Sequence, residues 1–337
     1  MGGGVINSTI TFYINNVEYK SPSNYTFAQW VNTSYNKDGY YNTGTYIVNY
    51  NTNKGIKDIN VNDTIEANKN YTLGDMVSYN LNDTFTLGKY QVESETPWPI
   101  EWEVVDKRDG YVIAMTKHII DCRCFDGKEP NNTDSDRKSK GNNNWQYSNI
   151  EQFLNSDQSN WYSAQHQYDA PPSSTNCYHY SNGTTFNAYD AHKGFLYYWS
   201  NEDKSLLQDM TFTLANNTVT DGGGSYTWTG KVWLPTYTQM GFGQNNSIAE
   251  GTKFSKFTDD TSRIKSLHPN CAANNEYCKI NNYNGGKNYW YWMSSVSLSK
   301  SYYVRRIIAD GMSRTDNAYS GYNGLAPCIC LPDIIIK

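Results

Sequence analysis

The segment YWYWMS at residues 289–294 is the stretch most typical of a buried strand in this sequence. Two similar segments follow it, YYVRRIIA at residues 302–309 and LAPCICL at residues 325–331. Aromatic and β-branched runs bounded by turn residues predict strands, and Asp310-Gly311 supplies such a turn after the second run. The chain is therefore predicted to end in a sheet.

More strands and a helix are predicted upstream of these segments. WEVV at residues 102–105 and YVIA at residues 111–114 flank a polar turn, which is typical of a hairpin. VWLP at residues 232–235 predicts a buried strand that ends at proline. Ser148, with Glu151 three residues later, has the spacing of a capping box and predicts a helix start. The polar segments 126–144 and 171–185 are predicted to be exposed loops.

The N-terminal residues have a different texture and predict a separate module. Residues 5–14 alternate polar and apolar side chains, and Asn15-Asn16 makes a turn into residues 17–19, so a hairpin is expected. A short helix at 25–31 and strands at 46–48 and 64–73 would complete a small β-grasp-like unit. We therefore expect an α+β protein with a β-rich docking or spacer module at 1–74 and a second domain at 75–337.

Composition narrows the class of function. The 337 residues carry a net charge of −5 with 28 basic residues, which argues against general disorder and against a grip on nucleic acid. The chain has no segment apolar enough to insert into a membrane. It holds 41 Asn and 30 Tyr, residue types that hydrogen-bond and stack with little charge, as antibody combining sites do. Binding is therefore favoured over catalysis.

The seven cysteines are expected to be free thiols. Their number is odd, and Met1-Gly2-Gly3-Gly4-Val5 does not start a secretory signal, so we expect synthesis in a reducing cytoplasm. The pairs Cys122/Cys124 and Cys328/Cys330 have one intervening residue, whereas zinc knuckles usually have two. Buried cysteine packs as a small hydrophobe, so we predict packing, no metal and no cofactor.

Residues Glu129-Pro130-Asn131 match the tripeptide with which calcium-dependent lectins hold a sugar. Carboxylate and amide oxygens suit such a hard cation. The tripeptide precedes the predicted helix, whereas lectins carry it late in the domain, and the companion Trp-Asn-Asp is absent. Whether calcium binds here stays open at this stage.

The aromatic C-terminal segment supplies the candidate binding site. If Trp290, Trp292, Val304 and Ile308 face the core, then period-two alternation turns their neighbours to the other face. Rigid aromatic side chains and arginine on an exposed face are typical of binding hot spots. The predicted ligand-binding residues are Tyr289, Tyr291, Tyr303, Arg305, Arg314, Asn317, Tyr319 and Tyr322.

Three stretches in order resemble a poorly characterised domain of bacteria and their phages with a C-type-lectin-like fold. They are 102–105 with the turn at Gly110, then 232–235, then 292–295 through 324–327. The resemblance covers about residues 76–337, but Met293, Ser294 and Ala326 stand where the family pattern has other residues, two of them arginine. The N-terminal module, including residues 28–32, resembles small β modules of phage structural proteins.

The resemblance implies recognition of a protein or glycan on a host surface by a phage tail or fibre protein that is not an enzyme. The same fold class includes the variable proteins of diversity-generating retroelements, whose mutated segment is rich in the residues that crowd 281–323 here. It further implies a location in the virion, with other phage structural proteins bound through the N-terminal module. Whether the chain forms a homo-oligomer is left open.

Two other functions remain as alternatives. Formylglycine-generating enzymes share the C-type-lectin-like fold and activate oxygen at copper held by two cysteines, for which Cys271 and Cys278 are the late pair in loop sequence. A structural virion decoration protein is the second alternative.

Overall fold

The computed structural model describes residues 11–14, 17–20, 76–108, 110–178, 187–332 and 334–336, with side chains described from Tyr79 to Pro332 within these ranges. The predicted helix at 25–31, the predicted strands at 46–48 and 64–73, and the boundary at 74/75 lie outside the described residues. Mixed helix and strand content, with mostly sheets and few short helices, makes this an α+β protein.

The chain divides into two compact units. One contains Met1–Asn80, Arg108–Val112 and Pro332–Lys337, and the other contains Leu81–Lys107 and Ile113–Leu331. In the first unit, β1 (Thr11–Ile14) pairs with β2 (Val17–Lys20) with Ile14 opposite Val17, which confirms the predicted hairpin. Also in this unit, β3 (Met76–Ser78) pairs antiparallel with β16 (Ile334–Ile336).

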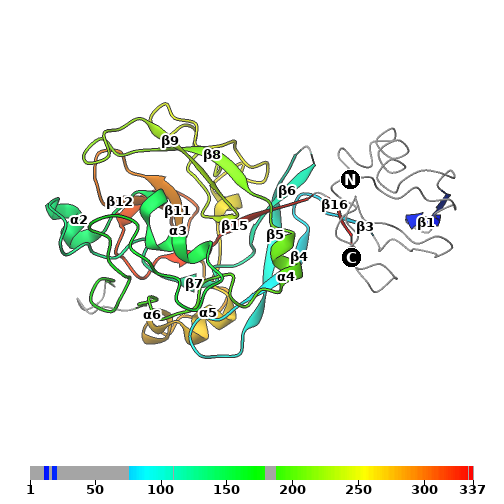
Figure 1. Cartoon of the computed structure of the whole chain (residues 1–337), viewed down its shortest axis with the longest axis horizontal. Helices are drawn as coiled ribbons and strands as arrows, with labels where there is room; N and C mark the ends of the chain where they lie inside the picture. Colours follow the sequence, from blue (N-terminus) through cyan, green and yellow to red (C-terminus); the bar gives the residue numbers. More distant parts are fainter. Residues whose placement is uncertain are drawn as a thin grey trace, which may run out of the picture. The chain divides into compact units, whose positions relative to one another are not determined.

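The second unit is built on two five-stranded sheets, seen in Figure 1 with the short helices around them. The first sheet has the order β10-β15-β6-β5-β4 and the second β13-β12-β11-β14-β7, and β8 and β9 form a separate hairpin. The strands are β4 (Thr84–Tyr90), β5 (Trp98–Arg108), β6 (Tyr111–Thr116), β7 (Asp121–Cys122), β8 (Met210–Ala215), β9 (Ser225–Gly230), β10 (Val232–Trp233), β11 (Tyr291–Val296), β12 (Tyr303–Ile307), β13 (Ser313–Asn317), β14 (Gly324–Leu325) and β15 (Cys328–Pro332).

The helices are short and begin at side-chain caps in most cases. They are α2 (Ser135–Lys140), α3 (Asn149–Leu154), α4 (Asn201–Ser205), α5 (Pro269–Asn274) and α6 (Glu276–Ile280), with the 3₁₀ turns η3 (Trp145–Tyr147) and η4 (Thr261–Arg263). Ser148 accepts a hydrogen bond from the Glu151 backbone N–H at 3.3 Å, so the predicted helix start is confirmed.

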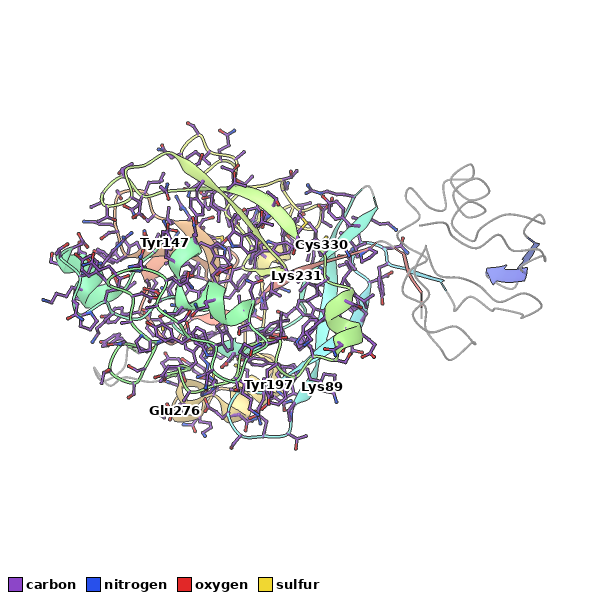
Figure 2. All side chains as sticks on the ribbon, viewed as in Figure 1. Lys89, Tyr147, Tyr197, Lys231, Glu276 and Cys330 are labelled. Carbon is purple, nitrogen blue, oxygen red and sulfur yellow. The ribbon has the colours of Figure 1, made fainter. Side chains whose placement is uncertain are left out.

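Two chain crossings join the sheets and form the centre of the core. The chain passes from β14 to β15 through Ala326 and Pro327, and from β6 to β7 through residues 117–120. The crossings run side by side, because Thr116 donates to Pro327 O and Ile120 donates to Leu325 O, each at 3.0 Å. The fully buried side chains of this unit include Trp102, Trp145, Trp233 and Trp292. Figure 2 shows how densely side chains occupy the unit. No helix among the described residues is long and apolar enough to cross a bilayer.

The segment 126–144 is not the exposed loop predicted from its polarity. It contains α2, and Asp126, Glu129 and residues 141–144 are buried. The reason is that its polar side chains bond to loop backbone and to one another, which satisfies them without water. Many asparagines of this chain therefore build the interior of loops.

Candidate functional site

Three of the eight predicted binding residues are buried. Tyr289 is 3 % exposed, Tyr291 0 % and Tyr322 5 %, so the predicted exposure of these tyrosines is wrong. All six residues of β11 are buried, because β11 lies between β12 and β14 and both of its faces are covered. Alternation along a strand exposes every second side chain only when one face of the sheet is solvated. The Tyr291 hydroxyl instead donates to Arg263 O at 2.6 Å inside the core.

The other predicted residues lie on β12 and β13 or follow them, but they do not share one face. Tyr303 pairs with Asn317 and Arg305 with Thr315, whereas Arg314 pairs with Arg306. Paired residues in an antiparallel ladder point to the same face, so exposed Arg314 lies on the face opposite Tyr303, Arg305 and Asn317.

Arg305 is used inside the fold. Its guanidinium lies 4.1 Å from the centre of the Tyr237 ring, and its Nη2 donates to Asn245 Oδ1 at 3.1 Å. Arg306 is held in the same manner on the other face, 4.4 Å from the Trp290 ring and 2.7 Å from Asp316. Ile308, predicted to face the core, is half-buried.

A group of tyrosines and lysines, half-exposed except for the buried Tyr302, lies where β12 begins and β13 ends. Tyr319 stacks on Tyr178 with ring centres 4.9 Å apart and planes at 18°. Tyr302 and Tyr303 have ring centres 4.4 Å apart. Lys128 Nζ lies 5.6 Å from the Tyr319 ring, and Lys140 Nζ lies 4.0 Å from the Tyr302 ring. We call these six residues the aromatic–lysine surface.

Backbone hydrogen bonds fix the aromatic–lysine surface. Tyr178 donates to Tyr319 O at 2.7 Å, Tyr319 donates to Lys140 O at 3.0 Å, and Ala318 donates to Tyr302 O at 2.9 Å. Partial burial and the neighbouring Tyr178 raise the pKa of Tyr319, so its hydroxyl is a hydrogen-bond donor at neutral pH. The backbone around the rings is therefore held in one arrangement, and the Tyr319 hydroxyl stays protonated.

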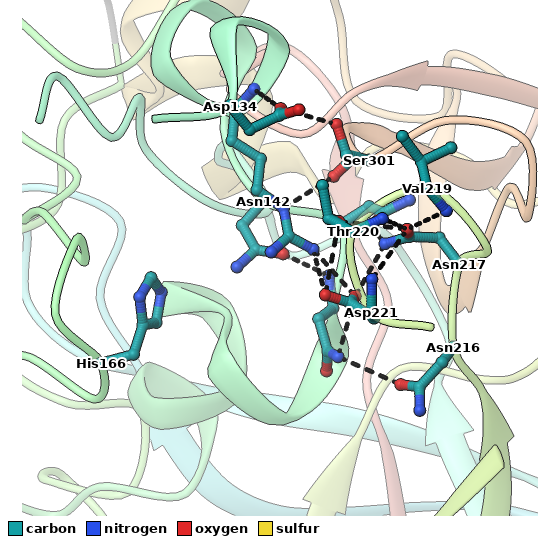
Figure 3. A network of polar contacts seen from close by, with 12 residues as sticks. Asp134, Asn142, His166, Asn216, Asn217, Val219, Thr220, Asp221 and Ser301 are labelled. Atoms are coloured by element: carbon teal, nitrogen blue, oxygen red, sulfur yellow. Dashed lines mark hydrogen bonds and ion pairs between the residues drawn. The ribbon is translucent and has the colours of Figure 1, made fainter. Parts of the chain in front are cut away.

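A polar network beside α2 anchors this helix, as Figure 3 shows. Arg137 binds both oxygens of Asp221 at 2.8 Å, and Asn144 and Asn217 donate to the same carboxylate. Ser301 Oγ donates to Asp134 Oδ1 at 2.9 Å, which ties the segment before β12 to the N-cap of α2. The geometry is that of a rigid support.

Of the six residues, Tyr303 and Tyr319 were predicted from the sequence, and Tyr178, Tyr302, Lys128 and Lys140 were missed. Tyr178 lies 141 positions before Tyr319 in a segment predicted only as a loop. No local pattern joins these two positions. The isolated bridge between Tyr178 and Ser320 and the backbone hydrogen bond from Tyr178 to Tyr319 bring them together in the fold.

In the tripeptide Glu129-Pro130-Asn131, the Glu129 carboxylate already has protein hydrogen-bond partners. Glu129 is buried, and its Oε1 lies 3.0 Å from His166 Nε2 and accepts from Asn142 at 3.2 Å, while Oε2 accepts from Asn132. The hydrogen bond to Glu129 raises the pKa of His166. Asn131 is exposed while Glu129 is buried, so their side chains are not presented together to solvent. The carboxylate acts as a structural acceptor here.

A cleft of about 370 Å³ opens near the end of β6. Its lining includes Lys117, Lys256, Lys265 and Glu103. Lys256 lies 2.6 Å from Glu103, and Lys265 Nζ donates to Thr116 O at 2.6 Å. Burial lowers the pKa of Lys265 to about 8. Among the described residues, the lining of the cleft contains no aromatic residue, so the cleft offers a ligand less stacking area than the aromatic–lysine surface does.

The close thiol contacts of the fold join cysteines that are distant in sequence. Cys124 Sγ lies 3.0 Å from Cys177 Sγ, and Cys122 Sγ lies 3.9 Å from Cys278 Sγ. Cys271 and Cys278 do come together, with Cys122 as a third member. All seven cysteines are buried and free.

Comparison with known proteins gives one match. Residues 109–333 match the model of a family described as a domain of unknown function, DUF6273. No curated protein and no solved structure matches the sequence. The matched range contains both chain crossings between the sheets and all six residues of the aromatic–lysine surface. The chain therefore belongs to the DUF6273 family.

Proposed function

We propose that this chain is a non-enzymatic ligand-binding protein and that the aromatic–lysine surface holds the ligand. The observation that carries the proposal is the stacked pair Tyr178–Tyr319 beside Tyr302 and Tyr303, with Lys128 and Lys140 at the rings. Tyrosines give large contact area at a low cost in conformational entropy. A rigid backbone below them lowers the cost further.

The chemistry of the surface favours a ligand with many hydroxyl or carbonyl groups. The Tyr319 hydroxyl can donate hydrogen bonds, and the ring faces can stack on apolar faces of a sugar or side chain. Lys128 adds positive charge, while the charge of Lys140 is shared with Asp136, 2.6 Å away. A glycan or a protein on a bacterial host surface meets these requirements. We infer a phage tail or fibre protein with a C-type-lectin-like domain in the virion, made in the host cytoplasm.

Diversification by a retroelement is compatible with part of the C-terminal segment. Asn317 and Tyr319 are half-exposed, so exchange at these positions changes the surface and spares the core. Tyr289, Tyr291 and Tyr322 are buried, so exchange there costs stability. The N-terminal module would dock onto other phage structural proteins, and a decoration protein would instead use the aromatic–lysine surface for that contact.

The copper oxidase alternative meets an obstacle in burial. Such an enzyme must bring a peptide thiol to its cysteines, and Cys122, Cys271 and Cys278 are each 0 % exposed. We therefore prefer binding.

The test is binding of the full chain to a printed glycan array and to a panel of bacterial cells. The variants Tyr319→Ala and Tyr178→Ala are compared with Tyr197→Ala, a matched control. Tyr197 is 39 % exposed and has Lys193 4.3 Å from its ring. It lies well apart from α2 in Figures 1 and 2.

We expect each surface variant to weaken binding by about 2 kcal/mol where the tyrosine is a hot spot, which is about 30-fold. The control is expected to bind as the wild type does. If all three variants bind as strongly as the wild type, the aromatic–lysine surface is not the binding site. If the chain binds only to purified phage structural proteins, the alternative function of a virion decoration protein is supported.

A further inference from the structure

Three buried thiols from distant parts of the chain meet in the second unit. Cys122 ends β7, Cys271 lies in α5 and Cys278 lies in α6. Their sulfur atoms all lie within 4.8 Å of one another, and each residue is 0 % exposed. The cluster is made of cysteines only, without histidine or carboxylate.

The spacing of the sulfurs suits a shared metal ion. Zinc binds thiolate sulfur at about 2.3 Å, so two sulfurs on one tetrahedral zinc lie about 3.8 Å apart. The distance from Cys122 Sγ to Cys278 Sγ is 3.9 Å. A disulfide needs about 2.05 Å. The pair Cys124–Cys177, at 3.0 Å, is too close for two ligands of one zinc ion, so the cluster differs from the other thiol contact of the fold.

Asn275 holds the three elements that carry the sulfurs. It lies between α5 and α6, and its Oδ1 accepts from the Cys278 backbone N–H at 3.2 Å. Its Nδ2 donates to Cys122 O at 3.0 Å and to Asp121 Oδ1 at 2.8 Å. One buried amide therefore fixes β7 against both helices, and the sulfurs are positioned before any ion binds.

The surroundings of the cluster favour a divalent ion. Three thiolates with Zn²⁺ leave one negative charge, and Lys287 and Arg123 are cations that act on the Cys278 sulfur. The buried Tyr289 hydroxyl lies close enough to feel the charge of Cys122 and also bonds to the Tyr277 side chain. The three sulfurs are therefore the ligands that the fold brings together for an ion.

We propose that Cys122, Cys271 and Cys278 bind one zinc ion that ties β7 to α5 and α6. Its three sulfurs are fully buried and join three elements, which suits a zinc ion that stabilises the fold. For Cys122, this proposal replaces the packing role expected from its spacing to Cys124. The proposal does not rest on the proposed binding function.

The test measures zinc in the full-length protein purified under reducing conditions. We expect about one zinc per chain in the wild type and at least a tenfold loss in Cys271→Ser. The control is Cys330→Ser, because Cys330 is also buried, at 1 % exposure, but lies outside the cluster. It is expected to retain zinc. X-ray absorption of the wild type should show three sulfur neighbours at about 2.3 Å.

Several results would overturn the proposal. The first is a wild type that holds no zinc and whose melting temperature does not rise when zinc is added. The second is a loss of zinc in Cys330→Ser as large as that in Cys271→Ser. A disulfide within the cluster, or copper(I) bound in place of zinc, would also overturn it. If Cys271→Ser fails to fold, the sulfur count from X-ray absorption of the wild type decides.

Discussion

Glu151 has a buried carboxylate with a raised pKa. Its side chain does not return to the Ser148 N–H, which donates to Trp145 O at 3.1 Å. The Glu151 Oε1 instead accepts from Trp228 Nε1 at 3.0 Å and from Asn155 Nδ2 at 3.2 Å. Burial raises its pKa from 4.5 to about 7. The residue therefore serves the packing of α3 against β9 as well as the helix start.

This raised pKa predicts a pH dependence of stability. Between pH 4.5 and about 7 the folded state binds more protons than the unfolded state, so the free energy of unfolding falls as pH rises and is level above pH 7. Glu151→Gln keeps an acceptor for Trp228 and removes the titration. Relative to this variant, the wild type should lose up to about 3 kcal/mol across the window. Denaturant unfolding of both proteins at several pH values checks this, and parallel profiles would contradict it.

Arg123 is a fully buried cation that joins several segments. Its Nε donates to Asp121 Oδ2 at 2.7 Å, and its Nη2 donates to Val92 O at 2.7 Å and lies 3.1 Å from Glu93. Asp121 also accepts from the Tyr90 hydroxyl at 2.6 Å. The network connects β7 to the end of β4 beside the thiol cluster.

Arg123→Leu should destabilise the protein by about 3–5 kcal/mol, because it leaves the buried Asp121 unpaired. Lys204→Met is the control, since Lys204 pairs with Asp157 at the surface, 3.0 Å away. We expect this change to cost no more than about 0.5 kcal/mol. The measurement is denaturant unfolding at neutral pH. A cost for Arg123→Leu as small as that of the control would show that the buried network adds little.

Among the elements, the turn between β12 and β13 makes the tightest demand on a glycine. Gly311 has φ +88°, and a Cβ there would lie 1.7 Å from Asp260 O, a backbone atom. Gly286 has a similar φ of +84° but nothing within 4 Å of a Cβ. A side chain at either position would have a similarly unfavourable positive φ, but only a side chain at Gly311 would also clash with Asp260 O.

Gly311→Ala should therefore destabilise the protein more than Gly286→Ala. We expect about 1 kcal/mol for Gly286→Ala from backbone strain alone, and at least about 2 kcal/mol more for Gly311→Ala. Thermal melts of both variants make the comparison. Equal melting temperatures would mean that the turn moves away from η4 without cost.

The sequence predicted those elements whose signal is local. The hairpin of β1 and β2, the neighbouring strands β5 and β6, the Ser148 helix start and the strand at Val232 are confirmed. Alternation failed on β11, because the sequence does not say that a strand is covered on both faces. Polarity failed on 126–144, because buried asparagines look like loop residues until their partners are known.

The site was harder to predict than the strands because its residues are distant in sequence. Tyr303 and Tyr319 were found from the aromatic segment, while Tyr178 and Lys128 reach the same place from other loops and Lys140 from the end of α2. The three thiols likewise come from positions 122, 271 and 278, which form no spacing motif. The fold, and not a local sequence pattern, brings together both the aromatic–lysine surface and the three thiols.

At the scale of the whole molecule, the second unit contains its own core. The two five-stranded sheets and the crossings between them lie within Leu81–Leu331, apart from the ends of β5, β6 and β15. A chain shortened to residues 79–332 should therefore melt cooperatively and close to the main transition of the full chain. Calorimetry of both proteins checks this. A broad transition without a heat peak would mean that the first unit is needed for folding.

The central claim is that the aromatic–lysine surface binds a ligand while the other tyrosines of the C-terminal segment support the core. The most direct measurement is stability and cell binding on the same two variants, Tyr319→Ala and Tyr291→Ala. Tyr291 is 0 % exposed and bonded to Arg263 O, so its loss should cost about 3–5 kcal/mol of stability. Binding per folded molecule should be unchanged.

Tyr319→Ala should show the reverse, with a stability loss of about 1 kcal/mol or less and binding weakened by about 2 kcal/mol. This reversed ranking is the predicted result. Unchanged binding per folded molecule in Tyr319→Ala, together with a stability loss as large as that of Tyr291→Ala, would contradict the account.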